Sequence, residues 1–440
     1  MKQNATLSAR EIAARILVRI EQDGAFAAAV LDVELARAVQ LSERDRAFAT
    51  ELVYGTLRAI RYIDERLSNH TDRGFRKLDI HVLSRLRIAA YQLLFLSRTP
   101  AFAAVNECVT AIRALRGPRL AGFANAVLRK LAADGTPANQ DAWIDALPDW
   151  LRERLIKILG QSAARMLVGE PGSVPPACLV VPNPNERDAI AHEIEASIPD
   201  VRIEVATHSP HGLRIWNAGA LTEHACVREG RAYVQEEGSQ LVALLAGVRS
   251  GDRILDACAG RGHKSVLLAY QAGPLGTVDV ADLHDAKLNQ LASAFSRLGF
   301  RFGERHVIDW SVGCGTAKAC FYDIVLVDAP CTGTGTIRRR PDILLRRKAA
   351  DIDELATLQS RILANAARCV REGGRLVYAV CSVLEEESNL VCEEFSNAHP
   401  LFVREPSPPL GTETTHGVLL HPLATGTDGY FVAAWRRRST

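Results

Sequence analysis

The chain has 440 residues, of which 48% are hydrophobic, 24% charged and 6% aromatic, and its formal net charge is +2, all ordinary values for globular proteins. Its length predicts about two to four domains, and the lack of an apolar run of about 18 residues argues against a membrane-spanning helix. The N-terminal residues lack the apolar core and cleavage site of a secretion signal, so we expect a cytoplasmic protein with no membrane partner.

Residues 1–138 are predicted to form an all-α bundle of about five to seven helices. Apolar residues recur there at steps of three and four, for example at Ile12 and Ile16, as expected of helices with one buried face. Ser8 and Ser42 stand just before such patterns and are candidate N-caps. The turn-rich sequence DGTPAN that ends this region predicts a linker.

The basic residues of the chain are concentrated in this helical part. Residues 1–140 contain 21 Lys and Arg against 14 Asp and Glu, whereas the rest of the chain contains 32 against 37. Positions 81 to 130 hold one acid, Glu107, and eight basic residues, which are Arg85, Arg87, Arg98, Arg113, Arg116, Arg119, Arg129 and Lys130. Such a segment suits a phosphate backbone, so we predict RNA contacts at Arg113, Arg116 and Arg119. A solvated helical face without a ligand is the alternative.

Two further parts follow the helical bundle. Residues 139–245 mix one helix with short extended stretches, which predicts a small α+β connector. Residues 246–440 alternate strands with helices, and this alternation predicts a mostly parallel α/β sheet. Ligands of such sheets bind at the carboxyl ends of the strands, so reactive residues are expected there.

The ten cysteines are scattered along the chain, without the paired spacing of a disulfide scaffold or a zinc site. We therefore expect reduced thiols and no metal ion. Most free cysteines are small buried hydrophobic residues. Cys331 and Cys381 stand in motifs that call for another explanation.

The first motif, LDACAGRGHKS at residues 255–265, predicts a strand that runs into a glycine-containing loop and then a helix. Gly260 and Gly262 let the backbone approach a ligand, and the helix N-terminus favours an anion or carboxylate. The loop matches neither the Walker A pattern nor the three-glycine dinucleotide motif. Asp282 follows the next strand, where a carboxylate can bind ribose hydroxyls, unless it is only a helix N-cap.

The second motif, VDAPCTGTG at residues 327–335, ends a buried strand and carries Asp328 and Cys331. Its glycines allow the chain to turn tightly around a planar base. An arginine run follows, and we predict that it contacts RNA phosphates, with surface solubility as the alternative. Its members are Arg338, Arg339 and Arg340.

The third motif, VYAVCSVLEEES, places Cys381 at the tip of another strand of the same sheet. Two cysteines at one sheet edge suit methylation of cytosine C5, an atom that is too weak a nucleophile to attack a methyl sulfonium directly. A thiolate that adds to C6 makes C5 reactive, and loss of the C5 proton then releases the thiol. We expect Asp328 to hold the cytosine edge and Lys264 to assist electrostatically.

These motifs resemble those of the RNA cytosine-C5 methyltransferases of the Nol1/Nop2/Sun family. DACAGRGHKS, DAPCTGTGTIRRRPDI and YAVCSVLEEES resemble the family's cofactor loop, its Asp-Ala-Pro-Cys motif and its Thr-Cys-Ser motif. The helical front part, with AAVNECVTAIRALRG and GFANAVLRKL, resembles the NusB-like RNA-binding domain. The resemblance covers nearly the whole chain, and the sharp motifs lie within residues 233–389.

The resemblance implies three parts: a NusB-like domain at 1–138, the connector at 139–245, and a Rossmann-like S-adenosylmethionine methyltransferase domain at 246–440. It implies that the protein methylates C5 of one cytosine in 16S ribosomal RNA, with cytosine 967 as the family expectation. We expect the protein to be a monomer. Cys381 matches the nucleophile, and Cys331 matches the second cysteine, which helps to release the product. The matched cofactor-binding residues are Cys258, Ala259, Gly260, Arg261, Gly262, His263, Lys264, Asp282, Asp309 and Asp328.

The chain departs from the family pattern at two places. The family's loop reads Cys-Ala-Ala-Pro-Gly-Gly-Lys, whereas this chain has Gly260, Arg261 and His263, and Val380 replaces the threonine before the nucleophile. The bulky loop residues leave a catalytically silent RNA-binding or assembly factor as an alternative. A tRNA cytosine methyltransferase is a second alternative, and a DNA cytosine methyltransferase with Cys331 as nucleophile is a third.

Overall fold

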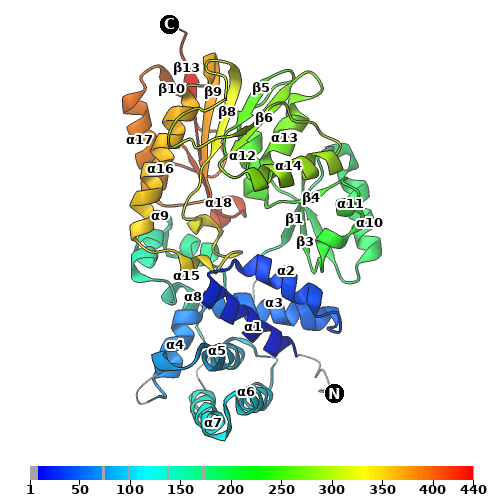
Figure 1. The fold of residues 1–440 in the computed structure, drawn as a ribbon, viewed down its shortest axis with the longest axis vertical. Coiled ribbons are helices and arrows are strands. Elements are labelled where there is room, and N and C mark those ends of the chain that lie inside the picture. Colours follow the sequence, from blue (N-terminus) through cyan, green and yellow to red (C-terminus); the bar gives the residue numbers. More distant parts are fainter. Residues whose placement is uncertain are drawn as a thin grey trace. The chain divides into compact units, whose positions relative to one another are not determined.

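A computed structural model describes residues 8–71, 75–97, 99–135, 138–139, 141–170 and 174–439 (Figure 1). The chain forms two compact units. The first comprises Met1–Val174 together with Ile337–Arg347, and the second comprises Pro175–Thr336 and Lys348–Thr440. The residues of the predicted connector are therefore shared between the two units.

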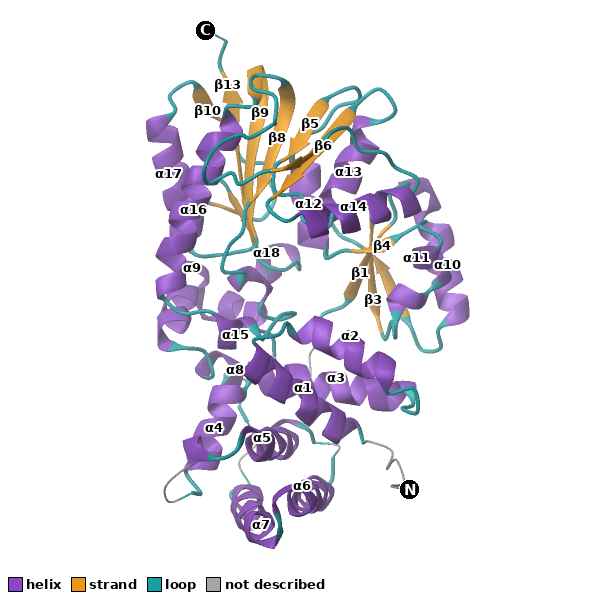
Figure 2. Cartoon of the chain, in the orientation of Figure 1, coloured by secondary structure: helices purple, strands orange, loops and turns teal. Residues whose placement is uncertain are grey.

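The first unit consists of helices, as predicted (Figure 2). Their bounds are α1 Ala9–Asp23, α2 Ala27–Arg37, α3 Glu43–Arg58, α4 Ile60–Ser68, α5 Ile80–Phe95, α6 Ala101–Arg116, α7 Pro118–Ala133, α8 Ala142–Asp145, α9 Asp149–Val168 and α15 Ile343–Arg346. Ser8 and Ser42 are N-caps, because their hydroxyls accept the N–H groups of Glu11 (3.3 Å) and Asp45 (3.1 Å). In the described part of the chain, no helix has the length and apolarity that crossing a bilayer requires.

Two arginines of the basic segment face carboxylates within this unit. Arg87, on α5, donates to Asp64 at 2.6 and 2.7 Å and to Glu21 at 2.7 Å. Arg85, two residues earlier on the same helix, pairs with Glu11 of α1. Because carboxylates already neutralise them, these two residues are poor candidates for phosphate contacts. Arg98 lies outside the described residues.

Residues 337–347 belong to the helical unit although they follow the second motif in sequence. The Arg58 side chain donates from Nη2 to the backbone oxygen of Arg338 at 2.5 Å. The guanidinium of Arg346 lies 3.6 Å from the ring centre of Phe26, a cation–π contact. No local pattern in the sequence predicted that this segment packs with the helices.

The second unit begins with a four-stranded antiparallel sheet and its helices. The strand order is β2 Arg202–Val205, β3 Gly212–Trp216, β1 Ala177–Val180 and β4 Tyr233–Val234, and the helices are α10 Arg187–Ser197 and α11 Ala225–Arg228. The extended stretches that the sequence indicated in the connector correspond to the first three of these strands. This subdomain has an apolar core of its own. The core includes Leu179, Ile190 and Leu213.

A nine-stranded sheet forms the rest of the second unit (Figure 1). Its order is β11 Thr412–Glu413, β12 Val418–Leu420, β13 Tyr430–Arg437, β9 Val370–Val380, β8 Tyr322–Asp328, β5 Arg253–Asp256, β6 Thr277–Asp282 and β7 Arg305–Val307, and β10 Phe402–Arg404 pairs with β13. The helices are α12 Glu237–Leu245, α13 His263–Ala272, α14 Asp285–Arg297, α16 Ala350–Ala367, α17 Asn389–Ala398 and α18 Pro422–Thr425. The α/β fold class is confirmed.

The expectation of a mostly parallel sheet is wrong for the C-terminal strands. Strands β7, β6, β5, β8 and β9 pair in parallel, whereas β10 to β13 pair antiparallel with their neighbours and with β9. The links β11–β12 and β12–β13 are short. Short links suit antiparallel pairs, because a parallel pair needs a crossover of a dozen or more residues.

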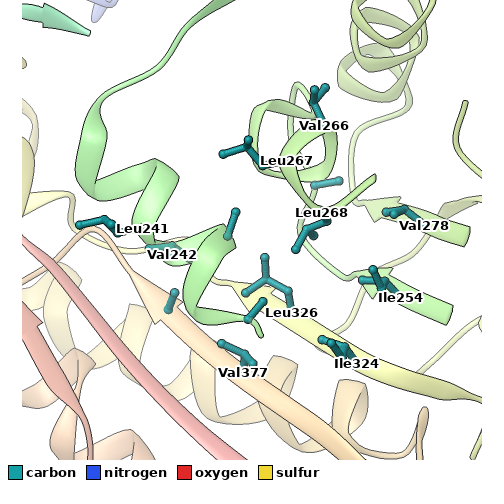
Figure 3. Packing of buried hydrophobic residues seen from close by; sticks show 14 of the residues in the cluster. Leu241, Val242, Ile254, Val266, Leu267, Leu268, Val278, Ile324, Leu326 and Val377 are labelled. Atoms are coloured by element: carbon teal, nitrogen blue, oxygen red, sulfur yellow. The ribbon is translucent and has the colours of Figure 1, made fainter. Parts of the chain in front are cut away.

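The core on one face of this sheet is built by three helices and alternate strand residues. Figure 3 shows Leu268 of α13 on the side of the helix that faces Ile254 and Leu326 of the sheet, and Val266 and Leu267 belong to the same core. Because strand residues alternate between the two faces, every second residue of a strand reaches this core. Each buried side chain of this kind contributes about 1.5–3 kcal/mol. This packing holds the loop between β5 and α13 in place.

Candidate active site

The predicted cofactor loop connects the end of β5 to the start of α13, as the first motif predicted. Gly262 has φ +83°, and a Cβ atom there would lie 2.5 Å from Cγ of Leu291. Gly260 has φ +57°, but a Cβ atom there would meet nothing within 4 Å. Both glycines supply a left-handed backbone, and only Gly262 is also needed for close packing.

Gly262→Ala is expected to lower both the stability of the protein and its affinity for the cofactor. A side chain at this φ costs about 1–2 kcal/mol, and the contact with Leu291 adds roughly 1–3 kcal/mol. Gly260→Ala is the matched control, because it carries the backbone cost alone. Urea unfolding and calorimetric titration with S-adenosylmethionine measure the two effects. Equal losses in both variants would contradict a role for the Leu291 contact.

Asp282 lies beside this loop at the end of β6. Its carboxylate accepts the N–H of Gly260 at 3.1 Å and that of His284, just before α14, at 2.9 Å. The ammonium of Lys287 is 3.4 Å away. Asp282 thus steadies both the glycine loop and the turn that precedes α14, and its ribose role remains a prediction.

The two bulky departures from the family pattern have exposed side chains. Arg261 and His263 are both exposed. The backbone oxygen of His263 accepts the hydroxyl of Tyr233 at 2.9 Å, and the two rings stack with centres 5.8 Å apart. The side chains of these residues therefore do not fill the interior of the loop.

Asp256 provides a buried carboxylate at the base of the loop. Oδ2 accepts the hydroxyl of Ser265 at 2.6 Å, whereas Oδ1 is buried and accepts no hydrogen bond from the described residues. Burial raises the pKa of Asp256 to about 7. Burial also raises the pKa of the nearby Cys258 thiol well above its usual value, so this cysteine stays protonated.

Asp309, another predicted cofactor residue, is exposed and sits in a local turn. It accepts the hydroxyl (2.6 Å) and the N–H (2.9 Å) of Ser311, and these bonds lower the pKa of Asp309. The neighbouring Trp310 donates from Nε1 to the backbone oxygen of Ala257 at 2.6 Å. Asp309 is thereby tied to the cofactor loop through the residue next to it.

Lys264 and Asp328 form an ion pair that joins the start of α13 to the end of β8. Nζ of Lys264 lies 2.5 Å from Oδ2 of Asp328, and both side chains are largely buried. Burial opposes the charge on Lys264, but the Asp328 carboxylate outweighs it and raises the pKa of Lys264. The lysine is therefore a fixed positive charge in the site, and its field reaches the sulfur of Cys381.

The two cysteines of the second and third motifs lie in contact. Their sulfur atoms are 3.3 Å apart, with Cys331 buried and Cys381 half-buried. The hydrogen bond with Cys381, together with burial, raises the pKa of Cys331 well above its usual value. Either sulfur can be the donor in this contact, and the raised pKa favours a protonated Cys331.

Sequence reasoning missed two residues of this site. Tyr430, at the start of β13, is buried, and its ring centre lies 5.9 Å from Nζ of Lys264. Glu387 is fully buried beside the cysteine loops. The run of three glutamates in the third motif hinted at a function, but nothing in the sequence distinguished Glu387 from its two neighbours.

The residues predicted to contact RNA all belong to the helical unit. Arg113, Arg116 and Arg119 are exposed near the junction of α6 and α7, and Arg116 pairs with Asp79 at 3.1 Å. The second set is in the segment that follows the second motif, and its members are Arg338, Arg339 and Arg340. Contact of either set with RNA remains a prediction.

Comparison with known proteins gives concordant results. A family model described as 16S rRNA methyltransferase RsmB/F matches residues 243–436, and one described as NusB family matches residues 7–133. The ribosomal RNA small subunit methyltransferase B of Pasteurella multocida is 30% identical, over 99% of this chain and 97% of that protein. The "Probable ribosomal RNA small subunit methyltransferase B" of Bacillus subtilis is 30% identical, over 98% and 99%. The crystal structure of PH0851, 23% identical, covers 98% of this chain and 99% of that one with a TM-score of 0.83.

Proposed function

The chain belongs to the ribosomal RNA small subunit methyltransferase B family, and from this premise we propose that it methylates C5 of one cytosine in 16S ribosomal RNA. Cytosine 967 is the expected target. The observation that carries the proposal is the 3.3 Å approach of the Cys331 and Cys381 sulfur atoms. We place the reaction in the cytoplasm, where ribosomal RNA is found.

The family uses S-adenosylmethionine, and the residues of the glycine loop fit this cofactor. Bound there, it supplies a methyl group on a positively charged sulfur. The loop offers acceptors at Asp282 and at the unpaired Oδ1 of Asp256, which suit the ribose hydroxyls and the amino group of such a ligand. The open space beside Gly260 lets the backbone approach it closely.

The proposed reaction proceeds through a bond between protein and RNA. The Cys381 thiolate adds to C6 of cytosine, and the electron pair of the C5–C6 double bond moves to C5, which takes the methyl group. When a base has removed the C5 proton, the double bond re-forms and the bond from sulfur to C6 breaks. The Cys331 thiol, 3.3 Å away, donates its hydrogen bond to the departing sulfur.

Lys264 and Asp328 have complementary parts in this scheme. The Lys264 ammonium stabilises the Cys381 thiolate before the attack. Asp328 uses Oδ2 to hold Lys264, and its other oxygen can accept a hydrogen bond from the cytosine amino group. One ion pair thus orients the base and activates the nucleophile.

Mapping 5-methylcytosine by bisulfite sequencing tests the proposal. In a strain that lacks this protein, we expect one site in 16S ribosomal RNA to lose methylation, and the wild-type gene should restore it. Loss of methylation only in tRNA would replace the proposed substrate. Unchanged methylation in both RNA classes would favour a silent assembly factor.

A further inference from the structure

Glu387 is a buried carboxylate that binds both cysteine loops. Its Oε1 accepts the N–H of Thr332 at 2.7 Å and the amide of Gln359, on α16, at 3.0 Å. Its Oε2 accepts the hydroxyl of Thr332 and, at 2.5 Å, that of Ser382. The side chain of Glu387 is fully buried, so four hydrogen bonds from three residues compensate a charge that would otherwise be costly.

Two of the three donor residues directly follow the two cysteines. Thr332 follows Cys331 and Ser382 follows Cys381, so one carboxylate binds the residue after each sulfur, through backbone and side chain at Thr332 and through the hydroxyl at Ser382. A backbone hydrogen bond also joins the two loops, because the N–H of Gly335 donates to the oxygen of Cys381 at 3.0 Å. Alternate conformations of either loop would leave a buried donor without a partner, which is unfavourable.

The charge of Glu387 also acts on the chemistry of the pair. It contributes, after the Cys381 hydrogen bond and burial, to raising the pKa of Cys331. A negative carboxylate therefore favours a protonated Cys331. The position of the two cysteine loops and the protonation of Cys331 are thus both linked to the Glu387 side chain.

We propose that Glu387 is a positioning residue that holds the two cysteine loops at reacting distance and places a negative charge beside the Cys331 loop. This inference rests on the proposed function for its catalytic consequence. The distance between the two sulfur atoms and the protonation of Cys331 can be measured without any RNA.

The experiment compares Glu387→Ala and Glu387→Gln with the wild-type protein. Dibromobimane, which becomes fluorescent when it bridges two nearby thiols, measures the approach of Cys331 and Cys381, with peptide mapping to assign the bridge. The pH dependence of Cys331 alkylation measures its protonation. Glu387→Ala should reduce bridging severalfold and methyl transfer about 10²-fold, as expected of a misplaced reacting group.

Glu387→Gln separates the effect of the Glu387 charge from that of its hydrogen bonds, because glutamine has nearly the same shape and no charge. It should retain most of the bridging, since glutamine can still accept from Thr332 and donate to the two hydroxyls, and it should recover part of the methyl transfer. The alkylation profile of Cys331 should move to lower pH, because the negative charge is gone. A merely structural glutamate would not move this profile.

Glu237→Gln is the matched control. Glu237 is an equally buried carboxylate of the same unit, and it accepts the N–H of His208 at 2.8 Å and the guanidinium of Arg214 at 2.6 Å. Its substitution should leave both thiol measurements unchanged. Wild-type bridging in Glu387→Ala, or a wild-type alkylation profile in Glu387→Gln, would overturn the inference. Normal thiol behaviour in a wild-type protein that methylates no RNA would instead refute the proposed function alone.

Discussion

Cys381→Ala is expected to abolish RNA methylation, with a loss of roughly 10⁴-fold or more, and to form no covalent complex with RNA. The reason is that Cys381 has a second thiol, Cys331, in contact with it and the ammonium of Lys264 nearby. No other thiol among the described residues combines these two neighbours. Transfer of a radiolabelled methyl group to 16S ribosomal RNA measures the loss. Denaturing gels show whether protein and RNA are bonded.

Cys331→Ala is the paired variant with the opposite signature. Without the thiol that assists the departing sulfur, the methylated RNA should remain attached to Cys381, and a denaturing gel should show a slowly migrating complex that wild-type protein does not accumulate. If the complex appeared with Cys381→Ala instead, the roles of the two cysteines would be exchanged.

Lys264→Met is expected to reduce both stability and methyl transfer. Breaking a buried ion pair costs about 3–5 kcal/mol, and since a quarter of the Asp328 side chain is exposed we expect about 2–3 kcal/mol here. Loss of the ammonium beside the Cys381 sulfur should lower the rate by about 10²- to 10³-fold. Urea midpoints and single-turnover methylation measure the two effects.

The double variant Lys264→Met with Asp328→Asn separates these effects. Removing both charges leaves no unpaired carboxylate, so stability should return most of the way to the wild-type value, whereas the rate should stay low. A double variant with restored activity would show that the pair is structural and takes no part in the reaction.

Local signals explain which parts of this fold were predictable. The strand, loop and helix around Gly262 follow from periodicity and from glycine positions, which depend on neighbouring residues in the sequence. Serine caps such as Ser8 and Ser42 have the same local character. The approach of Cys331 and Cys381 also followed, because parallel neighbouring strands bring their carboxyl ends to one edge.

Long-range partners explain what was missed. Arg85 and Arg87 counted as available cations in the sequence, yet acids far from them in the chain neutralise both. Glu387 could not be chosen from its run of glutamates, because the donors that select it come from loops around residues 332 and 382 and from α16. Strands β10, β11 and β12 have only two or three residues each, and their pairing depends on tertiary contacts.

The course of the chain through residues 337–347 limits how this protein can be dissected. A recombinant fragment starting at Pro175 would retain this stretch but lose its partners, among them Phe26 and Arg58. Such a fragment would present Ile337, buried in the whole chain, to water directly downstream of the Cys331 loop. Expressing the two halves together, instead of either alone, is therefore the sound route to studying the role of each.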